Sequence, residues 1–287
     1  MNYPDPRYLR IHGAILDNWH DPAPDLMAAK QSRLQNARLL LLASGKSGLL
    51  AAQRLRTLPF GNLTIVPHRT PDLEPLRILL REAAPHGCVA TMTRGAFQRS
   101  GFGVTMAGHH LMVVASDRPY PALLDTLNAI SLRVGTAWSQ ISIWGAEITL
   151  GPTVIPHVTA CYECYKRRCL ANEGRPDLWR ARDAWLRNDE NWAFEGQLAP
   201  IAHSAIAYLC AETERFLTAF RPPLALGRIL SRHMLLQRES VDDIIPVDAC
   251  PACHATETMD RRCEGDRLAS MIARTVARKE RVHGTSS

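Results

Sequence analysis

Two Cys-x-x-Cys pairs lie far apart in this chain, Cys161-x-x-Cys164 and Cys250-x-x-Cys253. Together they offer four thiolates, which is the ligand set of a closed, tetrahedral structural zinc site. A self-contained zinc ribbon has about 15–20 residues between its pairs, whereas 85 residues separate Cys164 from Cys250 here. The spacing therefore predicts that zinc joins two distant loops of one larger fold. Zinc would then be structural, and any chemistry would lie elsewhere.

Redox-active pairs and disulfides are the alternatives to a metal site. A thioredoxin-like pair requires a helix N-terminus after a strand, and two such pairs are hard to explain in that way. Residues 1–30 mix charge and proline without an apolar segment, so we expect no signal peptide and a cytoplasmic protein with reduced cysteines. The other four cysteines are expected to have ordinary roles; they are Cys88, Cys169, Cys210 and Cys263.

Length and composition favour one large α/β domain. The chain has 287 residues, of which 46% are hydrophobic, so it can bury a proper core. No apolar stretch approaches the roughly 20 residues of a membrane span, and a formal charge of +6 is mild for this size. We therefore expect neither a membrane nor a nucleic-acid partner.

The first half of the chain reads as a parallel α/β unit. An apolar strand at residues 38–43 is followed by a glycine-containing turn, a helix to about residue 58 and a second strand at 62–66. This order predicts a βαβ unit and hence a parallel sheet. Further elements are predicted, in chain order, as a helix at 26–36, a helix at 71–84, strands at 87–92 and 111–115, and a helix at 121–134.

The second half changes pattern at residue 136. Residues 136–155 alternate as an antiparallel hairpin around a turn at 144–146, residues 201–220 form an apolar helix, and 224–239 form one or two strands. Residues 171–196 are polar and tryptophan-bearing, and we expect them to be irregular apart from one helix near 178–186. The chain therefore divides into a Rossmann-like half and a zinc-anchored half that share one sheet.

The glycine turn has two nucleotide-binding readings. A P-loop would end in the Gly-Lys-Ser at 45–47, but its first glycine is replaced by Leu40. A Rossmann-type Gly-x-Gly-x-x-Gly turn falls on Ala43, Gly45 and Gly48, so one glycine of three is missing. The acid expected at the end of the second strand falls at Pro67, which has no side-chain acceptor. We interpret the nucleotide site as degenerate.

Several of these segments together resemble the ThiF/MoeB adenylating enzymes, which are related to ubiquitin activators. The opening at 7–10, Arg-Tyr-Leu-Arg, is similar to that family's Arg-Tyr-x-Arg, and residues 38–66 are similar to its nucleotide-binding unit. The strand end at 113–117 resembles the one whose last acid, here Asp117, helps to organise ATP and magnesium. The two cysteine pairs match the family's zinc knuckles in place and order. The resemblance covers about residues 7–255.

Within that superfamily, the stretch 151–156 before the first knuckle is most similar to the ThiF-like proteins of azole-modified peptide biosynthesis, which makes bacteriocins and related thiazole/oxazole peptides. Those proteins work beside a YcaO-type cyclodehydratase, which uses ATP to form azoline rings on a precursor peptide. The ThiF-like member binds the leader segment of the precursor and presents it, or activates its partner. Many carry a winged-helix peptide-recognition module before this domain, and here Arg7 already begins the ThiF-like pattern.

The resemblance implies a Rossmann-like ThiF-type α/β fold with a mixed central sheet and a structural four-cysteine zinc site. It implies a single domain at 1–255, divided into a degenerate nucleotide-binding half at 1–150 and a zinc-anchored half at 151–255, with a basic tail at 256–287. The implied function is a non-catalytic subunit of a peptide heterocyclase. Its expected partners are a precursor peptide, a YcaO-type enzyme and a second copy of the chain.

Three residues mark the vestigial nucleotide site, namely Gly45, Gly48 and Asp117, and we expect no catalytic residue and no bound ATP. Asp117 also precedes a helix, so a capping role is its structural alternative. The second functional hypothesis is an active adenylating enzyme acting on a peptide or carrier-protein carboxylate. The tryptophan-bearing segment 171–196 is the candidate peptide surface, although its tryptophans could equally pack on the sheet. His109 and His110 are expected to lie in a solvated turn.

Overall fold

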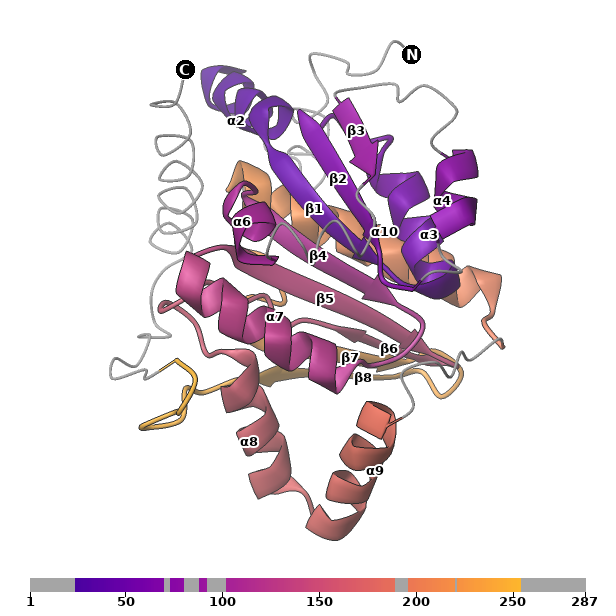
Figure 1. Cartoon of the computed structure of the whole chain (residues 1–287), viewed down its shortest axis with the longest axis vertical. Helices are drawn as coiled ribbons and strands as arrows, with labels where there is room; N and C mark the ends of the chain where they lie inside the picture. The colour runs from indigo at the N-terminus through magenta and orange to yellow at the C-terminus, as the bar shows by residue number, and fades with distance from the viewer. Residues whose placement is uncertain are drawn as a thin grey trace.

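The computed structural model describes residues 24–69, 73–79, 88–91, 102–188, 196–219 and 221–253. In that part of the chain one sheet of eight strands has the order β3-β2-β1-β4-β5-β6-β7-β8 (Figure 1). The five strands from β3 to β5 run parallel, and β6, β7 and β8 are added to them antiparallel. The mixed α/β sheet expected from the sequence is confirmed.

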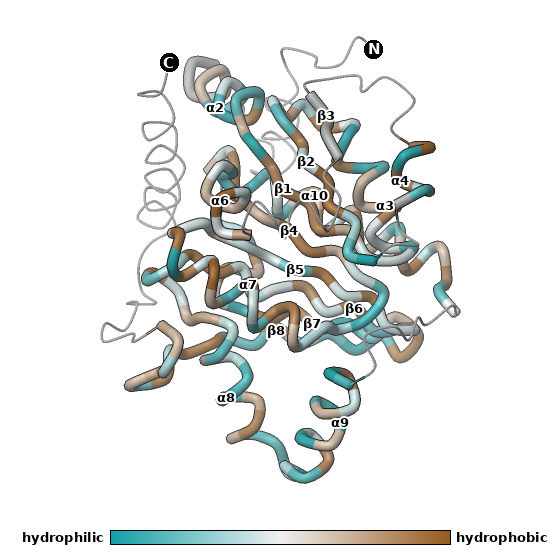
Figure 2. The backbone as a smooth tube through the Cα atoms, viewed as in Figure 1, coloured by the Kyte–Doolittle hydropathy of each residue, from teal (hydrophilic) through white to brown (hydrophobic). Residues whose placement is uncertain are grey.

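Five parallel strands form one part of the sheet, and β1, at their centre, is buried on both faces. They are β1 (Arg38–Ala43), β2 (Asn62–Pro67), β3 (Cys88–Thr91), β4 (Leu111–Ser116) and β5 (Ala137–Trp144). Leu39 and Leu41 of β1 belong to one core cluster, whereas Leu40 and Leu42 belong to the other. A strand that is covered on both sides needs a continuous apolar run and not an alternating one, and Figure 2 shows the hydrophobic colour along β1 and β4.

Helices cover both faces of the sheet. On one face the core includes side chains from α2 (Pro24–Asn36), α3 (Gly45–Leu55), α4 (Leu73–Leu79) and α10 (Ala199–Thr218). On the other face it includes side chains from α6 (Phe102–Ala107), α7 (Pro121–Val134) and the four knuckle cysteines. The cysteine cluster is thus part of the hydrophobic core on the α7 face.

The antiparallel end of the sheet agrees with the expected hairpin. Strands β5 and β6 (Glu147–Leu150) pair around a two-residue turn, with Trp144 opposite Glu147. The predicted strand region near 224–239 contains β7 (Arg228–His233) and the start of β8 (Arg238–Asp243). The sequence therefore located the change from parallel to antiparallel pairing correctly.

Residues 162–188 are largely helical, and they include most of the described part of the segment 171–196, which the sequence predicted to be irregular apart from one helix near 178–186. They form two helices, α8 (Tyr162–Asn172) and α9 (Pro176–Asn188), which extend away from the sheet in Figure 1. The apolar residues of α8 are few and do not follow a clear helical period, so the sequence pattern did not predict this helix. Only the helix expected near 178–186 is confirmed, as part of α9.

The prediction that His109 and His110 lie in a solvated turn is wrong. Both side chains are buried. The imidazole of His109 lies 2.7 Å from the carbonyl of Thr105 and 3.0 Å from the hydroxyl of Thr64. The Nδ1 atom of His110 accepts the backbone N–H of Arg38 at 2.9 Å. Both histidines connect the start of β4 to neighbouring segments, which is a structural role.

Some predictions fall outside the described residues. These are the Arg-Tyr-Leu-Arg opening, the tail from residue 256, Trp192 and Cys263, as well as the boundary at 255, which lies just beyond the last described residue. Among the helices that are described, none combines the length and the hydropathy needed to cross a bilayer.

Candidate metal centre and strand-end site

The four knuckle cysteines converge on one point. Their Sγ atoms all lie within 4.8 Å of one another, and every one of these residues is buried. The separation is 3.8 Å for Cys161–Cys164, 3.8 Å for Cys161–Cys250 and 3.7 Å for Cys164–Cys253. A regular tetrahedron with metal–sulfur bonds of about 2.3 Å has sulfur–sulfur edges of about 3.8 Å. The cluster therefore has the size that a tetrahedral metal ion requires.

The first knuckle is held by the start of α8. Cys161 is the N-cap residue of this helix, and Cys164 lies one turn later. The side-chain oxygen of Asn128, from α7, accepts the backbone N–H of Tyr162 at 3.0 Å. A helix N-terminus carries positive partial charge, which favours thiolates beside it. The local structure thus both positions and stabilises the two sulfur atoms.

The second knuckle is a turn that folds back onto the first. The backbone N–H of Val247 points to the Sγ of Cys164 at 3.4 Å, and the N–H of Cys250 bonds to the carbonyl of Val247 at 3.1 Å. Arg168 of α8 donates to the carbonyls of Ile245 and Pro246 at 3.2 and 3.1 Å. These contacts fix the approach of the chain to Cys250.

The thiols of Cys161 and Cys164 differ in their pKa values. The hydrogen bond from Cys161 lowers the pKa of the Cys164 thiol to about 5, and the N–H of Val247 adds to this while burial opposes it. Donation of that same hydrogen bond, together with burial, raises the pKa of Cys161. Cys164 is therefore the first of these two sulfurs to become a thiolate.

Lys166, two residues after Cys164, forms ion pairs with two carboxylates. Its ammonium group lies 2.6 Å from Asp125 and 2.7 Å from Glu163. The next two basic residues also make local contacts, since Arg167 forms an ion pair with Glu163 and Arg168 donates to a backbone carbonyl.

A second constellation lies where the strand order reverses. In the order β3-β2-β1-β4-β5 the chain turns back between β1 and β4, and ligands of open α/β sheets bind outside the carboxyl ends of such strands. There the carboxylate of Asp117 accepts the backbone N–H of Lys46 at 2.8 Å and that of Ser47 at 2.7 Å. Asp117 thus caps α3 in place of Ser44, the N-cap residue, whose side chain makes no capping bond.

Glycine is required at positions 45 and 48 because neighbouring atoms leave no room for a Cβ atom at either position. Gly45 has a positive φ of 64°, and a Cβ atom there would overlap the carboxylate of Asp117. A Cβ at Gly48 would come within 2.6 Å of the backbone of Ala43, so this glycine lets α3 pack closely on β1. The structure thus places Gly45 against Asp117 and Gly48 against Ala43, at the same end of β1.

Three further residues that sequence reasoning missed complete this end of the sheet. His68, directly after Pro67, packs edge to face on Tyr120 with ring centroids 4.6 Å apart, and its Nδ1 lies 3.4 Å from the hydroxyl of Ser44. The amide of Gln197, which precedes α10, donates to Asp117 at 3.3 Å and to Ser47. No local signal marks these residues, because they come from three separate segments.

Helix α9 is connected to the same strand end. The fully buried guanidinium of Arg118 lies over the Tyr120 ring at 4.8 Å and donates to the carbonyl of Leu186 at 3.3 Å. Trp185 stacks on Trp144 with ring centroids 6.2 Å apart, and its side chain is still 43% exposed. Part of the tryptophan-bearing segment therefore packs at the end of β5 and also presents an aromatic surface.

Comparisons with known proteins follow the fold. No family model and no curated protein sequence matches the chain. Among solved structures, E. coli MccB with MccA-N7isoASN matches with a TM-score of 0.65 and 16% identity, covering 88% of this chain and 76% of that one. E. coli MccB with ATP gives a TM-score of 0.62 and 18% identity, covering 88% and 75%.

A heterocyclase in complex with substrate and cofactor also matches. Its TM-score is 0.50 and its identity 14%, and the match covers 88% of this chain but 32% of that one. At such identities these likenesses show the fold alone. The chain has the ThiF-like fold that the sequence predicted, together with a four-cysteine cluster able to hold a metal ion.

Proposed function

We propose that this chain, which has the ThiF-like fold, is a non-catalytic subunit of a peptide heterocyclase complex. In this role it binds or presents a precursor peptide, or activates a YcaO-type partner that uses ATP to form azoline rings. The ATP chemistry would belong to the partner, and this chain would supply recognition and shape.

The contact between Asp117 and the start of α3 is the observation that carries the proposal. A Rossmann-type site binds phosphate through backbone N–H groups at this helix N-terminus. Here the N–H groups of Lys46 and Ser47 are already bonded to a carboxylate of the same chain. A phosphate at this position would have to displace that carboxylate and would be repelled by its charge. This arrangement supports a structural role for the strand end, in which Asp117 stabilises the fold and ATP is not bound.

The solved structures support the peptide part of the proposal. MccB has been crystallised with forms of MccA, and the heterocyclase with its substrate and cofactor. A ThiF-like fold is therefore found in proteins of both kinds, and one of them belongs to the class proposed here. The tryptophan-bearing segment 171–196 remains a candidate for contact with the peptide, since Trp185 is partly exposed.

Zinc is the metal that we propose for the cysteine cluster. Four thiolates in a closed tetrahedral set are typical of structural zinc, and such a site leaves no open position for substrate. The cysteines Cys161 and Cys164 would hold the ion from α8, and Cys250 and Cys253 from the turn after β8. The metal would contribute folding free energy. A homodimer is also part of the proposal, as the resemblance implies.

An active adenylating enzyme is the second candidate. The observation in its favour is that MccB, which shares the fold, has been crystallised with ATP. Such an enzyme would have to bind ATP with magnesium at the strand end, and Asp117 would have to turn away from α3 to help. The two candidates therefore differ in whether ATP binds this chain and in whether binding depends on Asp117.

Calorimetric titration of the zinc-loaded protein with ATP and magnesium tests the proposal. We expect no heat of ATP binding, and we expect heat when a precursor peptide or a YcaO-type partner is added. Mass spectrometry of the precursor, incubated with the partner and ATP, should show faster loss of water when this chain is present. Micromolar ATP binding that is abolished in Asp117→Asn would overturn the proposal in favour of the adenylating enzyme.

A further inference from the structure

The last strand of the sheet is open on one side. Among the described residues β8 pairs with β7 and with no other strand, and all six of its residues are exposed. An open edge strand is a template for pairing with another extended chain, and natural proteins either block such edges or use them. The side chains of β8 determine which residue types an added strand would carry.

Two rungs cross the antiparallel strands on the face that packs against α10. One rung is apolar, since Leu150 lies opposite Leu230 and Leu230 lies opposite Val241. In the other, Arg232 lies opposite Glu239, with Nε of the arginine 3.6 Å from the carboxylate. Both rungs end at an exposed residue, because Val241 is 52% and the Glu239 side chain 54% accessible.

The backbone groups of these same two residues point to the open edge. The N–H of Ile244 bonds to the carbonyl of Gly227 at 2.9 Å, which continues the β7–β8 register and marks a hydrogen-bonded pair. Antiparallel pairs alternate between bonded and non-bonded, so Val241 and Glu239 belong to the non-bonded pairs. Their N–H and C=O groups therefore face away from β7, toward an added strand.

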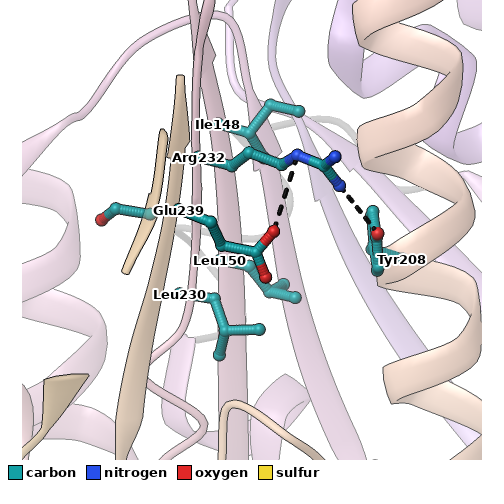
Figure 3. Close-up of a pocket in the computed structure, with 7 residues that line it drawn as sticks. Ile148, Leu150, Tyr208, Leu230, Arg232 and Glu239 are labelled. Carbon is teal, nitrogen blue, oxygen red and sulfur yellow. Dashed lines mark hydrogen bonds and ion pairs between the residues drawn. The ribbon is translucent and has the colours of Figure 1, made fainter. Parts of the chain in front are cut away.

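A shallow groove lies beside the two rungs. Figure 3 shows it between the face of the sheet and Tyr208 of α10, whose hydroxyl accepts a hydrogen bond from Arg232 at 3.0 Å. Its walls are largely apolar, with Ile148, Leu150 and Leu230 on the sheet side. An apolar side chain that packs on Val241 would thus continue the hydrophobic surface of Leu230.

We infer that β8 accepts an extended peptide segment of a partner polypeptide as a ninth strand. The inference rests on the proposed function, because it supplies a peptide surface for it. Cross-strand neighbours prefer opposite charges and matched apolar groups. The added strand therefore carries a basic residue opposite Glu239 and an apolar residue opposite Val241, in the alternating pattern basic-x-apolar. It bonds to the backbone of β8 and lies parallel or antiparallel to it.

A symmetric probe removes the question of direction. The seven-residue peptide Thr-Lys-Thr-Val-Thr-Lys-Thr, labelled with a fluorophore, presents the same pattern from either end. We expect saturable binding to the zinc-loaded full-length protein by fluorescence anisotropy. The same peptide with glutamate in place of both lysines should bind more weakly. In an antiparallel strand the N–H of the valine bonds to the carbonyl of Val241, so N-methylation of the valine should abolish binding. In a parallel strand the N–H of the threonine after the valine makes that bond, and N-methylation of this threonine should abolish binding instead.

Charge reversal on β8 gives the decisive comparison. Glu239→Lys should lower the affinity for the lysine peptide by about fivefold to tenfold and should raise the affinity for the glutamate peptide. Asp242→Lys is the matched control, because it makes the same charge change on the opposite face of β8 and should alter binding by less than about twofold. Equal effects of the two variants, or no binding of the lysine peptide, would overturn the inference.

A second copy of the chain is the competing occupant of this edge. Light scattering of the wild-type protein and of Glu239→Lys at the same concentration distinguishes the two cases. An unchanged mass supports a peptide site, whereas dissociation of a dimer by Glu239→Lys would overturn it. The proposed function has its own readout in ring formation on the precursor. If the lysine peptide does not bind but the chain still stimulates ring formation by the partner, the peptide site on β8 is rejected and the proposed function is not.

Discussion

The Sγ atom of Cys161 lies 3.8 Å from the Sγ of Cys250, although the two residues are 89 positions apart in the sequence. One belongs to the start of α8 and the other to the turn after β8, so a bound ion would join segments that lie before β7 and after β8 in the chain. A bond of this kind closes a long loop, and the chain entropy that folding must overcome falls accordingly.

Loss of a knuckle cysteine should therefore prevent stable folding. We expect Cys161→Ser and Cys250→Ser to yield insoluble or unfolded protein without bound zinc, because a structural zinc ion supplies folding free energy. Elemental analysis should give about one zinc per wild-type chain and per chain of the control variant Cys210→Ser. A double variant of Cys161 and Cys250 that stayed soluble, folded and cooperative in its unfolding would contradict the structural role.

Gly45→Ala should destabilise the protein by roughly 2–4 kcal/mol, since the residue has a positive φ and a Cβ there would overlap Asp117. Chemical denaturation measures this loss. Gly174→Ala is the control, because nothing lies within 4 Å of a Cβ at that position. Similar unfolding midpoints for the two variants would mean that the turn can rearrange around a side chain.

Asp117→Ala should lower the free energy of unfolding by about 1–2 kcal/mol, because it leaves the N–H groups of Lys46 and Ser47 without their acceptor. Thermal unfolding with and without ATP and magnesium measures both stability and binding. We expect ATP to leave the melting temperature of the wild-type protein unchanged. An increase for the wild type that Asp117→Ala removes would identify Asp117 as a nucleotide ligand.

Much of this architecture could be predicted because its signals are local. The apolar run at β1, the glycines at 45 and 48 and the turn before β6 each occupy a few consecutive residues, and backbone sterics alone connect them to a structure. The cysteine pairs were informative for a different reason. Thiols in paired Cys-x-x-Cys spacing have few uses besides metal binding, so residue type and spacing predicted a contact across most of the domain.

The features that were missed depend on partners from distant segments. His109 looked polar and exposed until its ring was placed between Thr105 and Thr64, and no sequence pattern encodes that pairing. Helix α8 begins at a knuckle cysteine and is weakly amphipathic, so its periodicity did not reveal it. In the same way Gln197 joins the strand end only because α10 packs beside α3.

Cys210 should be inert to alkylation near neutral pH. Burial in α10, reinforced by Glu214, raises the pKa of its thiol from 9.0 to about 12. Because the folded value lies above the unfolded one, its contribution to stability is complete below pH 9 and is lost as the pH rises toward 12. Peptide mapping after iodoacetamide treatment at about pH 8 should show Cys210 modified about a thousandfold more slowly than in the unfolded chain. Equal rates would mean that α10 opens readily.

Among the acidic residues of α10, Glu212 should be the one whose substitution destabilises the protein most, since its carboxylate is buried between two hydrogen-bond donors. It accepts the backbone N–H of Ala225 at 2.9 Å and the guanidinium of Arg215 at 3.0 Å, with only 4% of its surface exposed. Glu212→Gln replaces one acceptor by a donor and leaves Arg215 without its counter-charge, so we expect a loss of about 3 kcal/mol.

Urea denaturation of Glu212→Gln beside Glu239→Gln tests this expectation. The second variant makes the same chemical change at an exposed ion pair with Arg232 and should alter stability by no more than about 0.5 kcal/mol. Because Ala225 lies in the loop that leads into β7, the loss should be accompanied by faster amide exchange in β7 than in β1. Uniform exchange across both strands would show that Glu212 supports the whole sheet and not this loop.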